Sequence, residues 1–334
     1  MKKSTPKVLI PIVLSLLLIS VWPAVAMAGT FRTVVAFGDS LTDHFGLASY
    51  IGLYDPVRNP NGALEAWTNG DVWVEYLTDE LNADLDNNAI AGAMTLGHEN
   101  NNIQALVDAG KLPPLGLVGQ VNRFVNENNS FDPKTTLFAI WIGGNDLLEY
   151  GRGESSAADT QELITNAIDN IINSMSALAS DGARNILVIN LPDLGKTPAY
   201  NSRSAQEIQG VTALTSAFNA ALAQGIDGFK TVFPNVTIIS FDIFTNLNQI
   251  ISGDTFANVT GTYMVLDENG NRTGATNEPA EDYLFWDSIH PTTKAHKIVA
   301  DEIGDDLAAM GIKPVDDDDD STCFIDTLGL VSNW

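Results

Sequence analysis

A serine, a histidine and an aspartate are the side chains of this 334-residue sequence best suited to chemistry. Ser40 follows an apolar run over residues 34–37 and a Gly-Asp pair, so it lies where a buried strand ends in a turn. His290 stands three residues after Asp287, a spacing that lets the carboxylate reach the imidazole. A serine hydroxyl is a weak nucleophile at neutral pH, so it needs a base and a group that orients the base. These three side chains could supply all three roles.

Each of these residues also has a purely structural interpretation. Ser40 could cap a helix, because Ser and Asp are favoured at that position. Pro291 predicts the start of a helix over residues 292–310, so His290 could be a polar residue at that start and Asp287 part of a solvated loop. If a helix does begin there, its positive end disfavours an imidazolium, and a nearby carboxylate would offset that effect.

The other three histidines are weaker candidates for the base. His44 lies four residues after Ser40, in the same predicted turn, which disfavours its facing that hydroxyl. His98 has no carboxylate at a comparable spacing except its immediate neighbour. His296 falls inside the predicted last helix, where a surface or packing role is expected. We therefore predict that His290 is the base.

Acyl transfer also needs hydrogen-bond donors aimed at the developing oxyanion, and loss of one typically costs roughly a hundred- to a thousandfold in rate. A short predicted strand ends at Gly92, where the absence of a side chain lets a backbone amide approach a ligand. A longer apolar strand over residues 136–142 ends in a glycine pair followed by Asn145. An ordinary turn would explain either segment alone. Ligands bind beyond the carboxyl ends of strands in open parallel sheets, so both segments are expected beside Ser40.

In this order, residues 35–43, 87–95, 140–146 and 285–292 resemble the sequence blocks of the SGNH, or GDSL, family of lipases and esterases. Two further stretches support the branch of secreted phospholipases, lecithinases and haemolysins. They are Trp67–Leu77, similar to the family's Ser-Asn-Gly-x-x-Trp stretch, and Leu191–Gly195, similar to its Pro-Asp-Leu-Gly turn. The sequence departs from that branch at Met94, where Thr is frequent, and at Asp43-His44, where the branch continues Asp-Thr-Gly-Asn.

The resemblance implies a role for each matching residue. Ser40 would be the nucleophile and its amide the first oxyanion donor, with the Gly92 amide as second donor and the Asn145 side chain as third. Asp287 and His290 would complete the catalytic triad. Such a reaction requires no metal ion and no organic cofactor.

Alternating strands and helices predict one three-layer α/β/α domain with a doubly wound, five-stranded parallel sheet, the flavodoxin-like fold of the SGNH hydrolases. The expected strands are residues 33–37, 86–91, 136–142, 185–190 and 236–241. The expected helices are residues 70–82, 117–127, 158–180, 203–230 and 292–310. A hairpin or flap is expected over residues 261–276. An irregular insertion over residues 48–67 would either shape a pocket near Ser40 or simply pack its aromatic residues.

The two ends of the sequence differ from this domain, which we assign to residues 29–314. Residues 1–28 combine three lysines, an apolar run and a closing Ala-Met-Ala, which is typical of a bacterial secretory signal. The protein is therefore expected to be secreted, periplasmic or on the cell surface. Residues 315–334 contain five consecutive Asp and the single cysteine, Cys323. Self-repulsion predicts a disordered acidic tail, and attachment or processing near Cys323 is the alternative.

Composition excludes some classes of function. The formal net charge of −25 disfavours nucleic acid as a partner, because phosphate binding requires clustered positive charge. One cysteine permits no intramolecular disulfide, so stability must come from a hydrophobic core. The same negative charge disfavours anionic lipid headgroups and favours neutral or zwitterionic esters.

These observations predict an exported serine hydrolase that cleaves lipid, glycerophospholipid or short-chain carboxylic esters through an acyl-enzyme. Tyr54, Trp67 and Trp141 are candidates for contact with the substrate, and transient contact with a lipid surface is compatible with such substrates. A carbohydrate acetyl esterase or an acyltransferase could use the same residues. A surface binding module without turnover is an alternative of another class. The sequence makes no prediction of oligomeric state.

Overall fold

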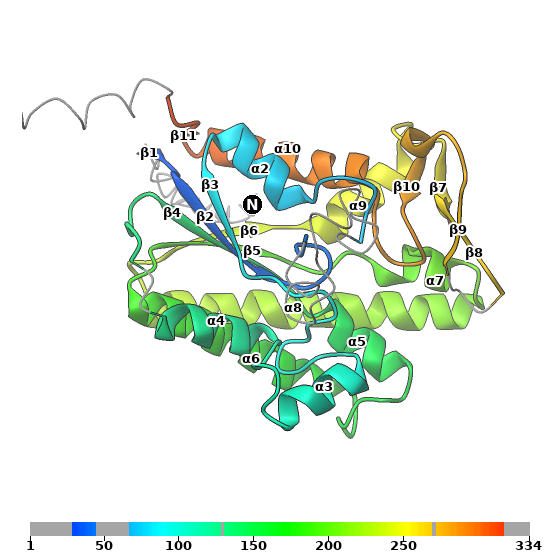
Figure 1. The fold of residues 1–334 in the computed structure, drawn as a ribbon, viewed down its shortest axis with the longest axis horizontal. Helices are drawn as coiled ribbons and strands as arrows, with labels where there is room; N and C mark the ends of the chain where they lie inside the picture. Colours follow the sequence, from blue (N-terminus) through cyan, green and yellow to red (C-terminus); the bar gives the residue numbers. More distant parts are fainter. Residues whose placement is uncertain (1–28, 45–66, 128–129, 269–271, 317–334) are drawn as a thin grey trace, which may run out of the picture.

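Five parallel strands form the central sheet of the computed structural model, which describes residues 29–44, 67–127, 130–268 and 272–316 (Figure 1). The strand order is β3-β2-β4-β5-β6. The strands are β2 (Thr33–Gly38), β3 (Asp84–Asn87), β4 (Thr136–Trp141), β5 (Asn185–Ile189) and β6 (Thr237–Phe241). The first strand of this series lies second in the sheet, which is the flavodoxin-like arrangement. This confirms the predicted three-layer α/β/α fold.

Helices cover both faces of the sheet (Figure 1). One face carries α3 (Asn101–Asp108), α4 (Leu117–Asn126), α5 (Gly144–Gly151), α6 (Thr160–Asp181) and α8 (Ala205–Val232). The other carries α2 (Trp73–Leu81), α9 (Ile243–Ser252) and α10 (Thr293–Ala309). Side chains of β2 alternate between two cores, because successive residues of a strand point to opposite faces. Val35 and Phe37 belong to the first core, and Val34 and Ala36 to the second.

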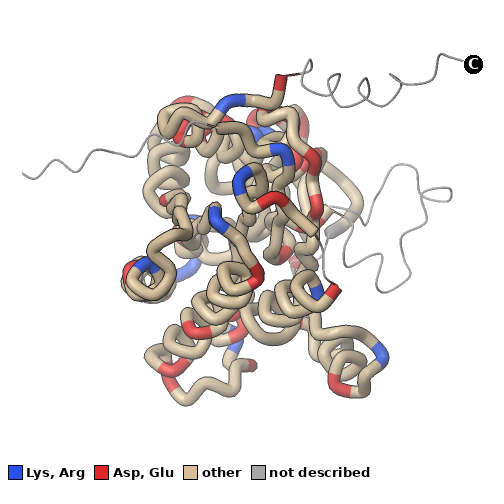
Figure 2. The backbone as a smooth tube through the Cα atoms, turned by 90° about the vertical axis from the view of Figure 1, so that its left-hand side faces the viewer, with Lys and Arg blue, Asp and Glu red and all other residues tan. Residues whose placement is uncertain are grey.

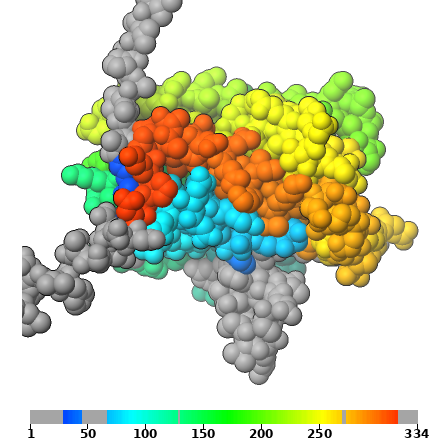
Figure 3. Space-filling model, turned by 90° about the horizontal axis from the view of Figure 1, so that it is seen from above, coloured from blue at the N-terminus to red at the C-terminus, as the bar shows by residue number. Residues whose placement is uncertain are grey.

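Smaller strands extend the domain beyond the central sheet. β7 (Asn258–Thr262) pairs in parallel with β10 (Tyr283–Phe285), and β8 (Met264–Leu266) pairs antiparallel with β9 (Arg272–Thr276). The second pair confirms the hairpin expected over residues 261–276. β1 (Gly29–Thr30) pairs with β11 (Ile312–Lys313), which brings the two ends of the described chain together. In Figure 3 the blue start and the red end of the described chain lie side by side.

The structure corrects several predicted boundaries. The strand expected over residues 86–91 covers Asp84–Asn87 instead. It lies at the edge of the sheet, where half of its side chains face solvent, so its sequence is polar. The apolar residues 89–91, which produced the wrong prediction, are buried in the loop that follows. Four short helices were not predicted: α3, α5, α9 and α7 (Pro198–Asn201).

The structure confirms the predicted span of the last helix to within one residue at each end. The helix begins at Thr293 with Thr292 as its N-cap, so Pro291 precedes the cap and forms an isolated bridge with Phe285. His290 therefore lies in the loop before the helix and not in its first turn. The predicted signal segment, most of the insertion and residues 317–334 of the predicted tail lie outside the described residues. Within the described ranges, no helix is both long enough and apolar enough to cross a membrane.

A buried glutamine fixes the carboxyl end of β2. Gln120 of α4 accepts the N–H of Gly38 at 3.0 Å and donates to the carbonyl of Gly38 at 2.8 Å and to that of Leu115 at 2.9 Å. Gly38 is packed so closely that a Cβ would lie 2.5 Å from the carbonyl oxygen of Trp141 on β4. The turn after Gly38, which carries Ser40, therefore starts from a fixed point.

Candidate active site

The structure brings Ser40, His290 and Asp287 together beyond the carboxyl end of β2. His290 Nε2 lies 2.8 Å from Ser40 Oγ, across 250 positions of sequence. The other ring nitrogen, His290 Nδ1, lies 2.9 Å from each carboxylate oxygen of Asp287. All three residues are buried. A hydroxyl, an imidazole and a carboxylate in this order form the hydrogen-bonded chain of a serine nucleophile with its base.

The environment of Asp287 keeps it ionised. Burial alone would raise its pKa, but the charge of His290, the ring hydrogen bond and two backbone N–H groups together outweigh burial. Those N–H groups belong to Ile289 and His290, at 3.0 and 2.9 Å from Asp287 Oδ1. The pKa of Asp287 therefore lies well below its usual range. An ionised Asp287 fixes the ring so that Nε2 faces Ser40.

The loop that carries His290 is fastened to a segment from the first quarter of the chain. Thr68 Oγ1 donates to the carbonyl of Pro291 at 3.0 Å, and the N–H of Thr293 donates to Asn69 Oδ1 at 2.9 Å. The ring of Trp67 lies against the His290 ring, with centroids 5.1 Å apart. Trp67, a candidate for substrate contact, is therefore beside the imidazole and is 36% exposed.

Two of the three predicted oxyanion donors, Gly92 and Asn145, lie on segments that contact each other. Asn145 is in the first turn of α5, and its Nδ2 donates to the carbonyl of Ala93 at 2.9 Å. Gly92 precedes that residue with φ of 77°, a value that favours glycine. A Cβ at Gly92 would lie 2.7 Å from the ring of His98, so the packing also excludes a side chain. Asn145 and Ser40 line the same pocket, whereas Gly92 is not among its lining residues and is linked to Asn145 through the carbonyl of the next residue, Ala93.

Two carboxylates that were not predicted as site residues, Asp146 and Asp43, hold these segments in place. Asp146 accepts the backbone N–H of Thr95 at 3.0 Å and its hydroxyl at 2.7 Å, and Asn170 of α6 donates to that hydroxyl at 3.2 Å. Asp43, on the turn after Ser40, accepts the N–H of Ala91 at 2.6 Å. Asp146 is therefore bonded to the loop after Gly92, and Asp43 to the residue before it. Both aspartates lie within the sequence blocks that resemble the family, but their spacing in the sequence does not reveal their hydrogen-bond partners.

Asp39 is a buried carboxyl directly before the serine. Burial raises its pKa to about 7, and the N–H of Leu41, 3.0 Å from Asp39 Oδ1, only partly compensates for the lost hydration. Burial likewise raises the pKa of Asp146 to about 6, against the hydrogen bonds from Thr95. The environments of Asp39, Asp146 and Asp287 therefore separate the pKa values of these three buried aspartates, since that of Asp287 is lowered.

An apolar pocket opens beside Ser40 and His290. Leucine, isoleucine and aromatic side chains make up most of its wall: Leu41, Trp141, Leu148, Leu191, Leu194, Ile243, Leu247, Ile250, Leu284 and Phe285. Trp141, the second candidate for substrate contact, lines this wall, and its buried Nε1 has no hydrogen-bond partner among the described residues. Tyr54, the third candidate, lies outside the described residues. Such a wall suits a hydrocarbon chain attached to the reacting carbonyl.

The remaining histidines have other partners. His296 accepts the backbone N–H of Trp73 at 3.3 Å, and burial lowers the pKa of His296 to about 3. This confirms its predicted packing role. A ring nitrogen of His98 lies 2.9 Å from the carbonyl of Ala91. His44 pairs with Glu75 of α2.

Known proteins are similar to this sequence over most of its length. The family model described as GDSL-like Lipase/Acylhydrolase matches residues 34–303. The thermolabile hemolysin of Vibrio parahaemolyticus is 28% identical over 282 residues, which cover 81% of this chain and 62% of the hemolysin. The phosphatidylcholine-sterol acyltransferase of Aeromonas hydrophila is 24% identical over 320 residues, covering 81% and 88% of the two chains. An acetylesterase of Hypocrea jecorina is 25% identical over 312 residues, covering 81% and 87%.

The protein therefore belongs to the GDSL lipase/acylhydrolase family, as its sequence blocks predicted. Membership places it among the carboxylic ester hydrolases. This chain spans slightly less than two thirds of the hemolysin's length.

The raised pKa of Asp39 predicts a pH-dependent loss of stability. The folded protein keeps the proton up to about pH 7, whereas the unfolded chain releases it near the ordinary value of 3.8, so stability falls as pH rises between these values. Asp39→Asn should remove this decline, and its advantage over the wild type should grow to at most about 4 kcal/mol above pH 7. Denaturant unfolding from pH 4 to 8 measures this. For the control Asp169→Asn, at an exposed position, the unfolding free energy should vary with pH as in the wild type. The same pH dependence in Asp39→Asn and the wild type would contradict a raised pKa of Asp39.

The bonds of Asp146 predict a positioning role. Asp146→Asn keeps the shape but replaces one acceptor oxygen by an amide NH2 group, itself a donor, that faces the donors of Thr95, so the Gly92 loop should shift. We expect kcat on a soluble aryl ester to fall about 10- to 100-fold with little change in KM, because misplaced donors weaken transition-state binding. Thr95→Ser keeps both donors and should retain the parent rate. An unchanged kcat in folded Asp146→Asn would refute the role.

Proposed function

We propose that the protein hydrolyses acyl esters of lipids through a covalent acyl-enzyme on Ser40. The observation that carries the proposal is the hydrogen-bonded chain from Asp287 through His290 to Ser40, which opens on an apolar pocket. In the first step Ser40 Oγ attacks the ester carbonyl and His290 Nε2 takes the hydroxyl proton. Asp287 stabilises the positive charge of the imidazolium, which then protonates the departing alcohol.

Three donors would hold the negative oxygen of the tetrahedral intermediate: the backbone N–H groups of Ser40 and Gly92 and the side chain of Asn145. Water, activated by His290, would then release the acid and restore the serine. Apart from this water, every step uses groups of the chain itself. The buried Asp146 and Asp43 support the donors by fixing the loops that carry them.

The pocket supports a substrate with an acyl chain longer than acetyl. Its wall is built almost wholly from hydrocarbon side chains, and burial of each methylene is worth about 0.8 kcal/mol. Acidic residues outnumber basic ones, 42 to 17, and Figure 2 shows them distributed over many parts of the tube. Neutral or zwitterionic headgroups are therefore preferred over anionic ones. The Vibrio and Aeromonas relatives, whose names include hemolysin and phosphatidylcholine-sterol acyltransferase, agree with a lipid substrate.

Export completes the proposal. Residues 1–28 have the composition of a bacterial secretory signal, so we place the enzyme outside the cytoplasm, where lipid esters of the surroundings are accessible.

Replacement of the nucleophile tests the mechanism. Ser40→Ala should lower kcat on a soluble aryl ester by about 10⁴-fold or more, because no other hydroxyl faces His290 Nε2 in the described site. It should also abolish covalent labelling by a fluorophosphonate probe. Ser288→Ala removes a second hydroxyl near the triad and should leave both signals unchanged. A wild-type protein that neither labels nor turns over would favour the binding module, and a fully active Ser40→Ala would refute the nucleophile.

A chain-length series tests the substrate class. For aryl esters from acetate to octanoate, kcat/KM should rise about fourfold for each methylene that enters the pocket. Ala295→Leu adds bulk to the pocket wall and should lower the octanoate rate selectively, whereas Ala308→Leu, exposed on the same helix, should not. A maximum at acetate would favour the acetylesterase alternative. Formation of a new ester from an added alcohol, in place of free acid, would assign acyl transfer.

A further inference from the structure

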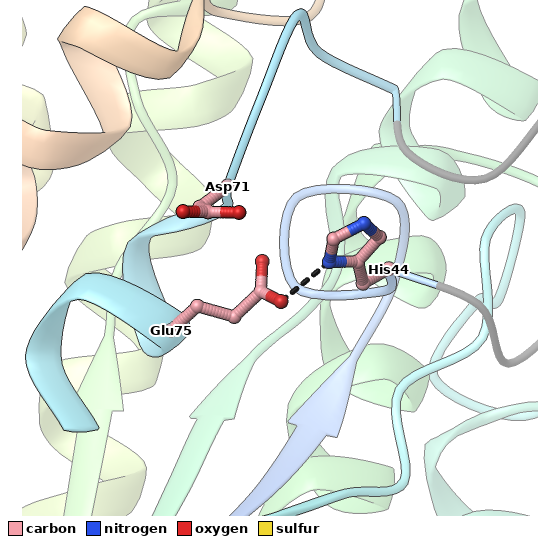
Figure 4. Close-up of side chains that lie close together, drawn as sticks. All are labelled: His44, Asp71 and Glu75. Atoms are coloured by element: carbon pink, nitrogen blue, oxygen red, sulfur yellow. Dashed lines mark hydrogen bonds and ion pairs between the residues drawn. The ribbon is translucent and has the colours of Figure 1, made fainter. Parts of the chain in front are cut away.

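A second cluster of titratable side chains lies apart from the triad. It consists of His44, Asp71 and Glu75, whose side chains converge in Figure 4. One nitrogen of the imidazole and one oxygen of each carboxylate all lie within 4.8 Å of one another. His44 comes from the turn after the nucleophile, and the two acids come from the start of α2. The fold therefore brings an imidazole from one segment to two carboxylates from another.

The backbone around each of these residues is already fixed. Glu75 Oε2 accepts the N–H of Val72 at 2.8 Å, which leaves Oε1 directed at His44. The carbonyl of Asp71 accepts the hydroxyl of Thr293 at 2.9 Å. His44 follows Asp43, which is bonded to the loop before Gly92. Metal ligands that are held in place before an ion binds lose little conformational freedom when it does.

The three groups have the chemistry and spacing of a cation site. Imidazole nitrogens and carboxylate oxygens bind first-row divalent ions at about 2.0–2.2 Å, so two ligands of one ion can lie up to about 4.4 Å apart. All three atoms lie within 4.8 Å of one another, so an ion would require them to draw slightly closer, and His44 and Glu75 would exchange their direct hydrogen bond for bonds to the ion. Two carboxylates also balance the charge of a divalent cation.

Access from solvent is retained. The side chains of His44 and Glu75 are 20% and 23% exposed, and Asp71 is exposed. Three protein ligands leave one or more coordination positions for water. These three side chains could therefore bind an ion and still leave it accessible to solvent.

We propose that His44, Asp71 and Glu75 bind a divalent first-row transition-metal ion that joins the nucleophile turn to the start of α2. The role is structural, because His44 bonds to Glu75 and not to Ser40. The competing assignment is a metal-free ion pair between protonated His44 and Glu75 at the helix start.

The test uses the full chain after treatment with a chelator and dialysis. Titration calorimetry with Zn²⁺ and Mn²⁺, with Ca²⁺ for comparison, should show one saturable transition-metal equivalent per chain. Saturation should raise the melting temperature by several degrees, because the ion binds only the folded state. Asp71→Asn and Glu75→Gln, which keep the shapes of the side chains, should each weaken binding at least tenfold and reduce the thermal shift. Asp79→Asn, an exposed acid on the same helix, should bind as the wild type does.

Several outcomes would overturn the proposal. They are no binding by the wild type at millimolar metal, saturable binding of Ca²⁺ alone, and wild-type affinity in both variants. The last result would assign the metal to other carboxylates, such as the Asp run at residues 316–320. Circular dichroism without metal shows whether each variant folds. His44→Gln provides a third variant from the other segment, and wild-type affinity in that variant would also overturn the proposal.

Discussion

The hydrogen bond between His290 Nε2 and Ser40 Oγ is the contact on which the rest of the site depends, because it joins residues 250 positions apart. Each partner is held by separate elements. Gln120 fixes the end of β2 before the serine, and Thr68 with Asn69 fastens the loop that carries the histidine. The packing of α10 against α2 and the β1–β11 pair hold the distant segments together. The sheet fixes the position of Ser40, and the loop contacts hold His290 beside it.

Buried carboxylates form the next level of the site, and each accepts backbone N–H groups. Asp287 bonds to its own loop, Asp43 to the residue before Gly92 and Asp146 to the residue three positions after it. Buried charge lowers stability unless it is paired, so such groups fix a conformation at an energetic cost. Asp39 illustrates that cost, because its pKa of about 7 reflects a carboxyl whose hydrogen bonds do not replace its hydration. The buried carboxylates therefore lower the folding stability of the protein while they fix the geometry of the loops around Ser40.

The sequence allowed prediction of the fold class and of the residues that meet at the site, since nucleophile, base and amide donor follow buried strands or have a suggestive spacing. It could not show the edge strand β3, whose polar side chains reflect exposure on one face. The short helices α5 and α9 were missed because their few turns produce little periodicity. The bonds of Asp43 and Asp146 were also not predictable, because each joins residues about 50 positions apart that only the folded sheet brings together.

The two departures from the family pattern show how the chain can vary without changing its reactive groups. At Met94 the backbone N–H and carbonyl bond to Gly97 and Leu117, so the loop is held whatever the side chain. At His44 the imidazole pairs with Glu75, while the preceding Asp43 keeps its bond to Ala91. At both positions, the hydrogen bonds that support the site are therefore made by the backbone or by a neighbouring residue, and not by the side chain that departs from the family pattern. Variation at these positions changes what surrounds the nucleophile turn, whereas the hydrogen bonds from Asp287 through His290 to Ser40 are made by other side chains.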